Sequence, residues 1–159
     1  MFTIDKLVHR LSKVSHFKDL PPSAIYEIVS AGEVHRYPKG LLLFSEGEPC
    51  SGLYVLFHGR IHLCKISPQG QQSIIGVVNP VIMFNEVPVL DGGTNPVTAV
   101  VDEACVLWHI SRDNFQALAK RYPVLALSLL PVLAARNRKL LIFCEDINFR
   151  SVMGRTAKI

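Results

Sequence analysis

From residue 33 to residue 110 the sequence is a series of short β-rich runs, separated by turns of glycine, proline and polar residues. The runs read EVHRY, GLLLF, GLYVLF, RIHLCKI, QSIIGVV, VTAVV and ACVLWHI. Valine, isoleucine and aromatic residues favour strands, whereas glycine and proline interrupt them. Short strands at such regular spacing predict a small antiparallel barrel or jelly roll, so we expect an α+β fold that is mainly β.

Four glycines lie in these turns, and each is expected to need a positive φ or a close backbone approach: Gly40, Gly47, Gly59 and Gly70. At His58-Gly59 we expect a hairpin between two strands. An empty roll would need the same glycines, so they indicate the fold and carry no information about a ligand.

Helices are predicted on both sides of the β-rich region. Residues 4–11 place apolar side chains at helical spacing, and LPPSAIYEIVSAG combines a proline at a helix start with Gly32 just past its end. After the last strand, Ser111 is the expected N-cap of the helix RDNFQALAKRY. The β-structure therefore has flanking helices.

A long helix is predicted from residue 123 to residue 147, with Pro131 causing a kink or a break near its start. Six residues are separated by 4, 3, 4, 3 and 4 positions in an a/d heptad rhythm: Leu129, Leu133, Arg136, Leu140, Phe143 and Ile147. The strict period of about 3.5 residues favours a homodimer interface. A helix that packs on its own β-structure also needs an apolar stripe, and stays the alternative.

The composition is that of one folded domain. Of 159 residues, 49% are hydrophobic and 19% are charged, which excludes intrinsic disorder. No apolar run reaches the roughly 18 residues of a membrane span, and the first residues lack the apolar centre of a signal peptide. We therefore expect a cytoplasmic protein that does not interact with a membrane.

Neither the charge nor the cysteines identify a partner. The net charge of +4 permits an acidic partner such as nucleic acid, but the basic residues are scattered along the chain. The four cysteines are far apart and form no CxxC pair, so structural thiols are expected instead of a zinc or iron–sulfur site. No metal site is predicted.

Together these segments resemble the effector domain of the Crp/Fnr-type bacterial transcription regulators, the cyclic-nucleotide-binding β-roll. The resemblance rests on RYPKGLLLFSEGEPCSGLYVLFHGRIHLCKISPQGQQSIIGVVNP and VLWHISRDNFQALAKRYP, and it covers nearly the whole chain. It implies a double-stranded β-helix jelly roll in residues 1–122 and a dimerisation helix in 123–147. Residues 148–159 then form the hinge and the start of a helix-turn-helix DNA-binding domain.

The resemblance also places a ligand site in the segment MFNEVPVLDGGTNPVTAV, residues 83–100. In relatives that bind cyclic AMP, Phe-Gly-Glu opens a short helix, and an arginine ten residues after the glutamate binds the phosphate. Here Glu86 is kept, but the arginine position holds Pro96, which has neither a charge nor an N–H donor. We therefore expect binding of neither cyclic AMP nor cyclic GMP, because no cation would contact the phosphate.

The candidate pocket residues that the resemblance implies are Phe84, Asn85, Glu86, Val87, Pro96, Val97, Leu140 and Leu141. Asn85 can adopt a left-handed conformation as glycine does, but its side chain is expected to crowd the approach of a phosphate. Leu140 and Leu141 replace a hydroxyl-bearing pair that faces the base. These changes make the site more apolar, so we expect either another small-molecule effector or a vestigial pocket, and no cofactor.

Metal and haem sites have weaker support in the sequence. His58 and His62 have the spacing of a cupin-type metal site, but the turn expected at Gly59 would separate them, so both are predicted to be surface histidines. Haem sensing occurs in the resembled family and remains an alternative. Its candidate axial ligands are His35, His62, Met83 and Cys105.

No catalytic residues are predicted, because Glu46, Glu48 and Glu86 have no nucleophile or oxyanion element beside them. We expect an effector-sensing and dimerisation domain of a Crp/Fnr-like regulator. It would act on promoter DNA through a helix-turn-helix domain that follows Ile159, with RNA polymerase as a further partner. The alternative is a stand-alone allosteric or protein-interaction module that does not bind DNA.

Overall fold

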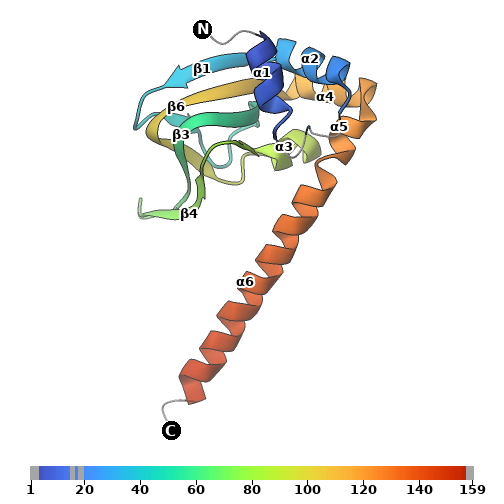
Figure 1. Ribbon diagram of the computed structural model, residues 1–159. Coiled ribbons are helices and arrows are strands. Elements are labelled where there is room, and N and C mark those ends of the chain that lie inside the picture. The colour runs from blue at the N-terminus through green and yellow to red at the C-terminus, as the bar shows by residue number, and fades with distance from the viewer. Residues whose placement is uncertain (1–3, 15–16, 18–19, 157–159) are drawn as a thin grey trace.

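Antiparallel strands form the centre of the protein (Figure 1). They are β1 Glu33–Tyr37, β2 Leu42–Phe44, β3 Gly52–Ile66, β4 Gln72–Val78, β5 Ile82–Phe84 and β6 Thr98–Ser111. The main path of the sheet is β1-β6-β3-β4, with β2 paired to β6 and β5 paired to β3. The computed structural model describes residues 4–14, 17 and 20–156, with side chains as far as residue 146. The arrangement is the antiparallel jelly roll that the sequence predicts.

Strands β3 and β6 are longer than predicted, because in each of them two predicted runs join into one strand. The hairpin expected at His58-Gly59 is wrong, since β3 continues through it and pairs with β6 on both sides. Gly59 has a φ of 88°, and the pairing register shifts between Leu56 and His58 and again between His58 and Arg60. The glycine therefore produces an irregularity within a strand and not a chain reversal.

A positive φ is confirmed at each of the four predicted turn glycines: Gly40, Gly47, Gly59 and Gly70. Left-handed backbone of this kind is strained for residues that carry a Cβ. Gly40, Gly47 and Gly70 thus allow short connections between strands, whereas Gly59 lies within β3.

Two apolar clusters fill the interior. The first joins the helices to the sheet around Trp108, whose Nε1 donates to the Val29 carbonyl at 3.4 Å. The second lies within the roll and includes the rings of Phe44, Tyr54 and Phe84, of which the last two stack with centroids 5.3 Å apart. Burial of this apolar surface is the main source of stability, and the second cluster forms one wall of the pocket described below.

The flanking helices α1 Ile4–Leu11, α2 Pro22–Ser30, α4 Arg112–Arg121 and α5 Pro123–Leu127 gather at one end of the roll (Figure 1). The prediction that Ser111 caps the helix after the last strand is confirmed. Its Oγ accepts from the backbone N–H of Asn114 at 3.2 Å, at the start of α4. A shorter helix, α3 Glu86–Asp91, follows β5.

The predicted long helix is divided in two. α5 ends at Leu127, and α6 Leu130–Thr156 begins with Pro131 in its first turn, which is where the sequence predicts a break. Leu129 lies in this break and is fully buried in the core of its own chain. Its predicted place at the start of a dimer interface is therefore corrected, because a side chain with no exposed surface cannot meet a partner.

Beyond the break, α6 leaves the roll and extends away from it (Figure 1). All residues from 134 to 146 are exposed, including the heptad residues Leu140 and Phe143. The helix continues to Thr156, across the boundary predicted at residue 148. The side chain of Ile147, which was predicted for the dimer interface, lies outside the described residues, as does the segment 157–159.

Within the described ranges, no single helix is both long and apolar enough to cross a membrane. Only α4 combined with residues 123–146 meets the criteria of length and composition, and that pair is bent by 112°.

Candidate functional site

The turn between β5 and α3 is the first element of the site. Asn85 occupies it with a φ of 69° and a ψ of 26°, a left-handed conformation that asparagine tolerates. Its side-chain amide donates to the Gly52 carbonyl at 3.0 Å and to Asn95 Oδ1 at 3.2 Å. These bonds fix the turn and engage both donors of the Asn85 amide.

The segment that leads into β6 is fixed by a second buried amide. The Nδ2 of Asn95 donates to the Ser45 carbonyl at 3.2 Å, and its backbone N–H donates to the Glu48 carbonyl at 2.8 Å. A buried amide with these partners holds the chain in one path. Pro96 and Val97 are thereby placed at the pocket just before β6 begins.

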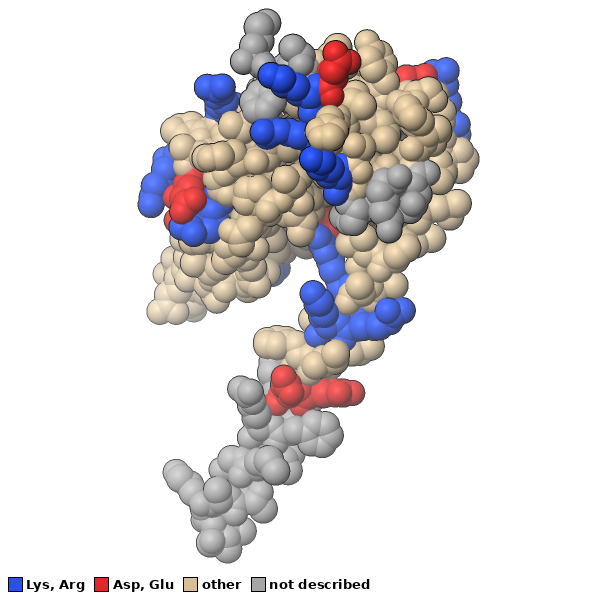
Figure 2. All heavy atoms as spheres, viewed as in Figure 1, with Lys and Arg blue, Asp and Glu red and all other residues tan. Residues whose placement is uncertain are grey.

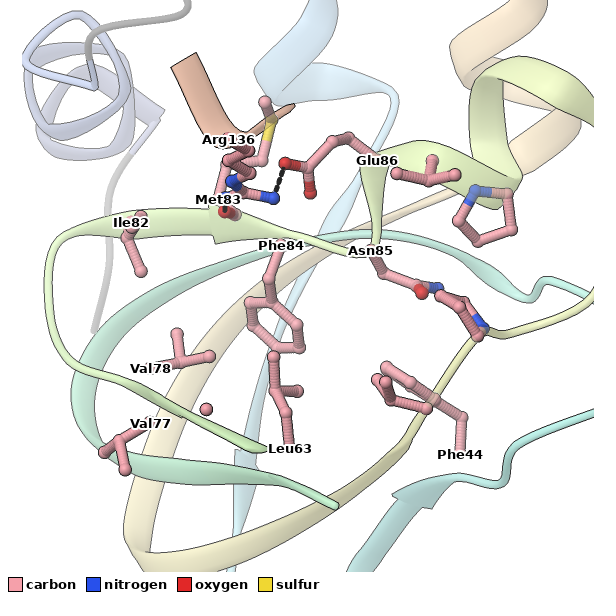
Figure 3. A pocket seen from close by; sticks show the side chains of 15 residues that line it. Phe44, Leu63, Val77, Val78, Ile82, Met83, Phe84, Asn85, Glu86 and Arg136 are labelled. Atoms are coloured by element: carbon pink, nitrogen blue, oxygen red, sulfur yellow. Dashed lines mark hydrogen bonds and ion pairs between the residues drawn. The ribbon is translucent and has the colours of Figure 1, made fainter. Parts of the chain in front are cut away.

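These segments enclose the β5–α3 pocket, which has a volume of about 260 Å³ and is shown in Figure 3. It is lined by Phe44, Leu63, Gly76, Val77, Val78, Ile82, Met83, Phe84, Asn85, Glu86, Val87, Pro88, Pro96, Val97 and Arg136. Most of these side chains are apolar. The volume lies slightly below the range of about 300–1,000 Å³ that holds drug-sized ligands, so the pocket fits a small molecule.

Six of the eight residues implied by the resemblance line this pocket: Phe84, Asn85, Glu86, Val87, Pro96 and Val97. Leu140 and Leu141 do not, and each is 58% exposed on α6. Because α6 projects from the roll at that point, a single chain does not bring these two side chains to the pocket (Figure 1).

A charged pair lies at one side of the pocket (Figure 3). The Glu86 carboxylate, whose side chain is 1% exposed, accepts a hydrogen bond from Nη1 of Arg136 in an ion pair. Arg136 comes from α6, and its Nη2 also donates to the Met83 carbonyl at 3.5 Å. Burial raises the pKa of Glu86 above its ordinary value, and the neighbouring guanidinium offsets part of this increase.

Arg136 corrects the prediction that no cation reaches the ligand site. The sequence places Arg136 only in a dimer interface, whereas the structure places it in the pocket wall. The sequence does indicate that Arg136 differs from the other heptad residues, because it is the single charged residue among the six. A charge on an apolar stripe often has a partner within its own chain.

Several apolar pocket residues were also not predicted: Phe44, Leu63, Val77, Val78 and Ile82. They come from strands β2 to β5, which are brought together only by the pairing of the sheet. Local sequence patterns do not specify which of these strands face each other across a pocket.

The candidate haem ligands lie on different parts of the roll. Met83 lines the pocket, Cys105 is buried within the second apolar cluster, and His35 and His62 lie on β1 and β3. Among the residues that the structure describes, no three His, Cys, Asp or Glu side chains gather in a way that could hold a metal ion. Both His58 and His62 were predicted to lie at the surface; His58 is exposed, whereas the His62 side chain is only 24% exposed.

Basic side chains stand in separate groups on the face of the molecule that Figure 2 shows, with acidic side chains among them. On this face, the described basic side chains do not form the dense patch that is typical of a nucleic-acid-binding surface.

The profile of the cyclic nucleotide-binding domain matches residues 34–122, which is more than half of the chain. The CRP-like cAMP-activated global transcriptional regulator of Mycobacterium tuberculosis is 29% identical over 150 residues, covering 93% of this chain and 66% of that protein. The chain thus spans about two thirds of the length of this relative.

Solved structures show the same relationship. The catabolite activator protein of Thermus thermophilus matches with a TM-score of 0.76 at 27% identity, over 85% of this chain and 63% of that one. The sensor domain of the transcriptional regulator DNR from Pseudomonas aeruginosa matches with a TM-score of 0.73 at 25% identity, over 84% of this chain and 89% of that domain. The chain therefore belongs to the cyclic nucleotide-binding domain family, and it is similar to the Crp-like transcription regulators.

Proposed function

We propose that this chain is the effector-sensing and dimerisation domain of a Crp-like, DNA-binding transcription regulator whose effector is not a cyclic nucleotide. The observation that carries the proposal is Pro96, which lines the pocket at the position where the resemblance places the phosphate-binding arginine. Similarity to a transcription regulator over 93% of the chain supports the regulatory role, and the relatives named above are regulators and not enzymes.

The groups around Pro96 do not replace the missing arginine. Proline has no N–H and no charge, and both donors of the Asn85 amide are engaged by Gly52 and Asn95. Arg136 bonds to Glu86 and to the Met83 carbonyl, so it belongs to a different part of the pocket wall. Loss of a bidentate, charge-assisted arginine partner of the phosphate weakens binding by about two to three decades.

The exposed part of α6 supports a homodimer. Its apolar side chains Leu140 and Phe143 are each 58% exposed and lie three positions apart on one face. Isolated helices with such side chains bury them against a second helix, and a symmetric dimer uses the same face twice. We expect the interface to contain Leu133, Leu140, Phe143 and Ile147, without Leu129, which is buried in its own chain, and without Arg136, which lines the pocket.

The ion pair between Glu86 and Arg136 gives the pocket a direct connection to α6. A ligand that changes the position or the charge of either partner changes the contact that holds α6 against the roll. A ligand can shift the conformation of a protein only through such differential contacts. Sensing in this chain would therefore act through α6.

The remaining parts of the function follow from the resemblance. A helix-turn-helix domain after Ile159 would bind promoter DNA, and RNA polymerase is the expected further partner. The expected site of action is the cytoplasm. A mobility-shift assay on the 159-residue chain is expected to show no specific operator binding at physiological salt, because the resemblance assigns base reading to the helix-turn-helix domain.

The proposal is tested by calorimetric titration of the chain with cyclic AMP and with cyclic GMP. We expect no heat of binding at millimolar nucleotide. An absorbance spectrum of the same sample is expected to lack a haem band. Binding of either nucleotide at micromolar concentration would overturn the proposed ligand specificity.

A further inference from the structure

The β5–α3 pocket has an apolar interior and a charged pair at one side. Figure 3 shows Leu63, Val77, Val78 and Phe84 in the part of the pocket away from that pair. These side chains carry no hydrogen-bonding atom. The portion of a ligand that occupies this part must therefore be apolar, since a polar group would lose its hydrogen bonds to water there.

Arg136 is the side chain with hydrogen-bond donors to offer on the charged side. Its bonds to Glu86 and to the Met83 carbonyl use only part of the guanidinium N–H groups. Its side chain is 44% exposed, whereas that of Glu86 is 1% exposed and covered by its surroundings. The guanidinium is therefore the more accessible of the two charged groups.

We propose that the β5–α3 pocket binds a small amphipathic acid, with an apolar body in the interior and a carboxylate that pairs with Arg136. A carboxylate accepts from a guanidinium in a planar, charge-assisted geometry, whereas an alcohol offers a weaker acceptor and an ammonium group is repelled. The inference rests on the proposed sensing function, because it names the class of effector for the same pocket.

The bound acid would compete with Glu86 for Arg136. The ligand carboxylate and the Glu86 carboxylate share one guanidinium, and two like charges at one site oppose each other. Entry of the acid therefore weakens the contact between the roll and α6. Replacement of Glu86 by glutamine removes the competing charge and is expected to increase the affinity for the acid.

The test is a nuclear magnetic resonance titration of the nitrogen-15-labelled chain with three probes that share one apolar body: octanoate, 1-octanol and octylammonium. Octanoate is expected to bind at least about tenfold more tightly than 1-octanol, and octylammonium most weakly. The shifted backbone amides are expected to lie in β5, in α3 and around Arg136. Equal affinity of the three probes would overturn the assignment of the carboxylate, and the absence of any shift would overturn the ligand class.

Variants of the charged pair sharpen the test. Arg136→Gln is expected to weaken octanoate binding by about 10- to 100-fold, and Glu86→Gln to strengthen it. Arg138→Gln removes an equal charge from an exposed position of α6 and is expected to leave octanoate binding unchanged. The double variant E86Q/R136Q removes both charges and leaves no buried charge unpaired. Compared with Glu86→Gln, its loss of octanoate affinity therefore reports the loss of the guanidinium alone. Octanoate binding that is the same with and without Arg136 would contradict the inference.

Failure of this inference differs from failure of the proposed function. If none of the three probes binds and cyclic AMP also gives no heat, the acid class alone is wrong. If cyclic AMP binds at micromolar concentration, the proposed function is wrong, whatever octanoate does.

Discussion

Glu86 and Arg136 are separated by 50 residues, yet they form an ion pair between the turn that opens α3 and the long helix α6. The carboxylate is buried and the guanidinium is half-exposed. This ion pair connects the pocket to α6, the helix that we propose forms the dimer interface. Substitutions of the two partners therefore test the structural basis of sensing.

Glu86→Gln is expected to change how stability depends on pH. The pKa of Glu86 is raised in the folded chain, mainly by burial, so the folded state holds its proton more tightly than the unfolded state does. Wild-type stability then falls as pH rises from the ordinary carboxyl pKa through the raised value. The glutamine variant lacks this loss, so it should gain stability relative to wild type as pH rises above the ordinary carboxyl pKa.

The measurement is urea unfolding of both proteins at each pH. Subtracting one free energy of unfolding from the other removes the contribution of all other titrating groups. A variant that loses stability relative to wild type as pH rises would show that Arg136 outweighs burial, with the pKa of Glu86 lowered instead of raised.

Arg136→Gln is expected to reduce the free energy of unfolding by about 1–3 kcal/mol, because it leaves the buried Glu86 without its counter-charge. The loss stays below that of a fully buried pair, since the Arg136 side chain is 44% exposed and solvent screens it. Urea midpoints provide the measurement, with Arg138→Gln as the control that changes stability by less than about 0.5 kcal/mol. The double variant E86Q/R136Q should recover most of the loss, and an equal loss in it would exclude an unpaired charge as the cause.

Leu140→Glu combined with Phe143→Glu is expected to convert a dimer into monomers, because like charges would then face each other across the helix pair. Multi-angle light scattering gives the mass directly. The control is Ile142→Glu, since Ile142 is 59% exposed but lies outside the heptad positions, and this variant should remain dimeric. If the mass of the double variant stayed that of a dimer, Leu140 and Phe143 would not form the dimer interface.

Gly59→Ala is expected to destabilise the chain more than Gly40→Ala does. Both glycines have a positive φ, but an added Cβ at Gly59 would lie 2.5 Å from the Ala104 carbonyl oxygen, whereas at Gly40 it meets nothing within 4 Å. Backbone strain costs each variant about 1–2 kcal/mol, and the clash adds at least about 1 kcal/mol at Gly59. Thermal unfolding compares the two, and equal losses would mean that β3 moves away from β6 without cost.

Local rules predicted much of the fold. The runs EVHRY and QSIIGVV coincide with β1 and β4, and the Ser111 cap has its expected hydrogen bond. β5 has three residues, too few for a strand period to be visible in the sequence. Gly59 shows a further limit, because a positive φ suits a hairpin and an irregularity within a strand alike, and only the pairing of β3 with β6 decides between them.

The sequence predicted those pocket residues that the resemblance supplied. It did not predict the residues that only tertiary contacts bring to the pocket. Leu129 fits the heptad spacing, but it lies in the break between α5 and α6, and its side chain enters the core. The same break sets the path of α6 and brings Arg136 to Glu86. Periodicity counts residues along one continuous helix and cannot anticipate a change of direction within it.

The most direct test of the account is a calorimetric titration of the variant P96R/V97S with cyclic AMP, beside the wild-type chain. The substitutions restore the charge and the hydroxyl that the relatives place at these positions of the pocket wall. If residue 96 decides which ligands the pocket accepts, the wild-type chain gives no heat at millimolar nucleotide and the folded variant binds at least about 100-fold more tightly. A folded variant that gives no heat of binding, like wild type, would contradict the account. A wild-type chain that already binds at micromolar concentration would contradict it as well.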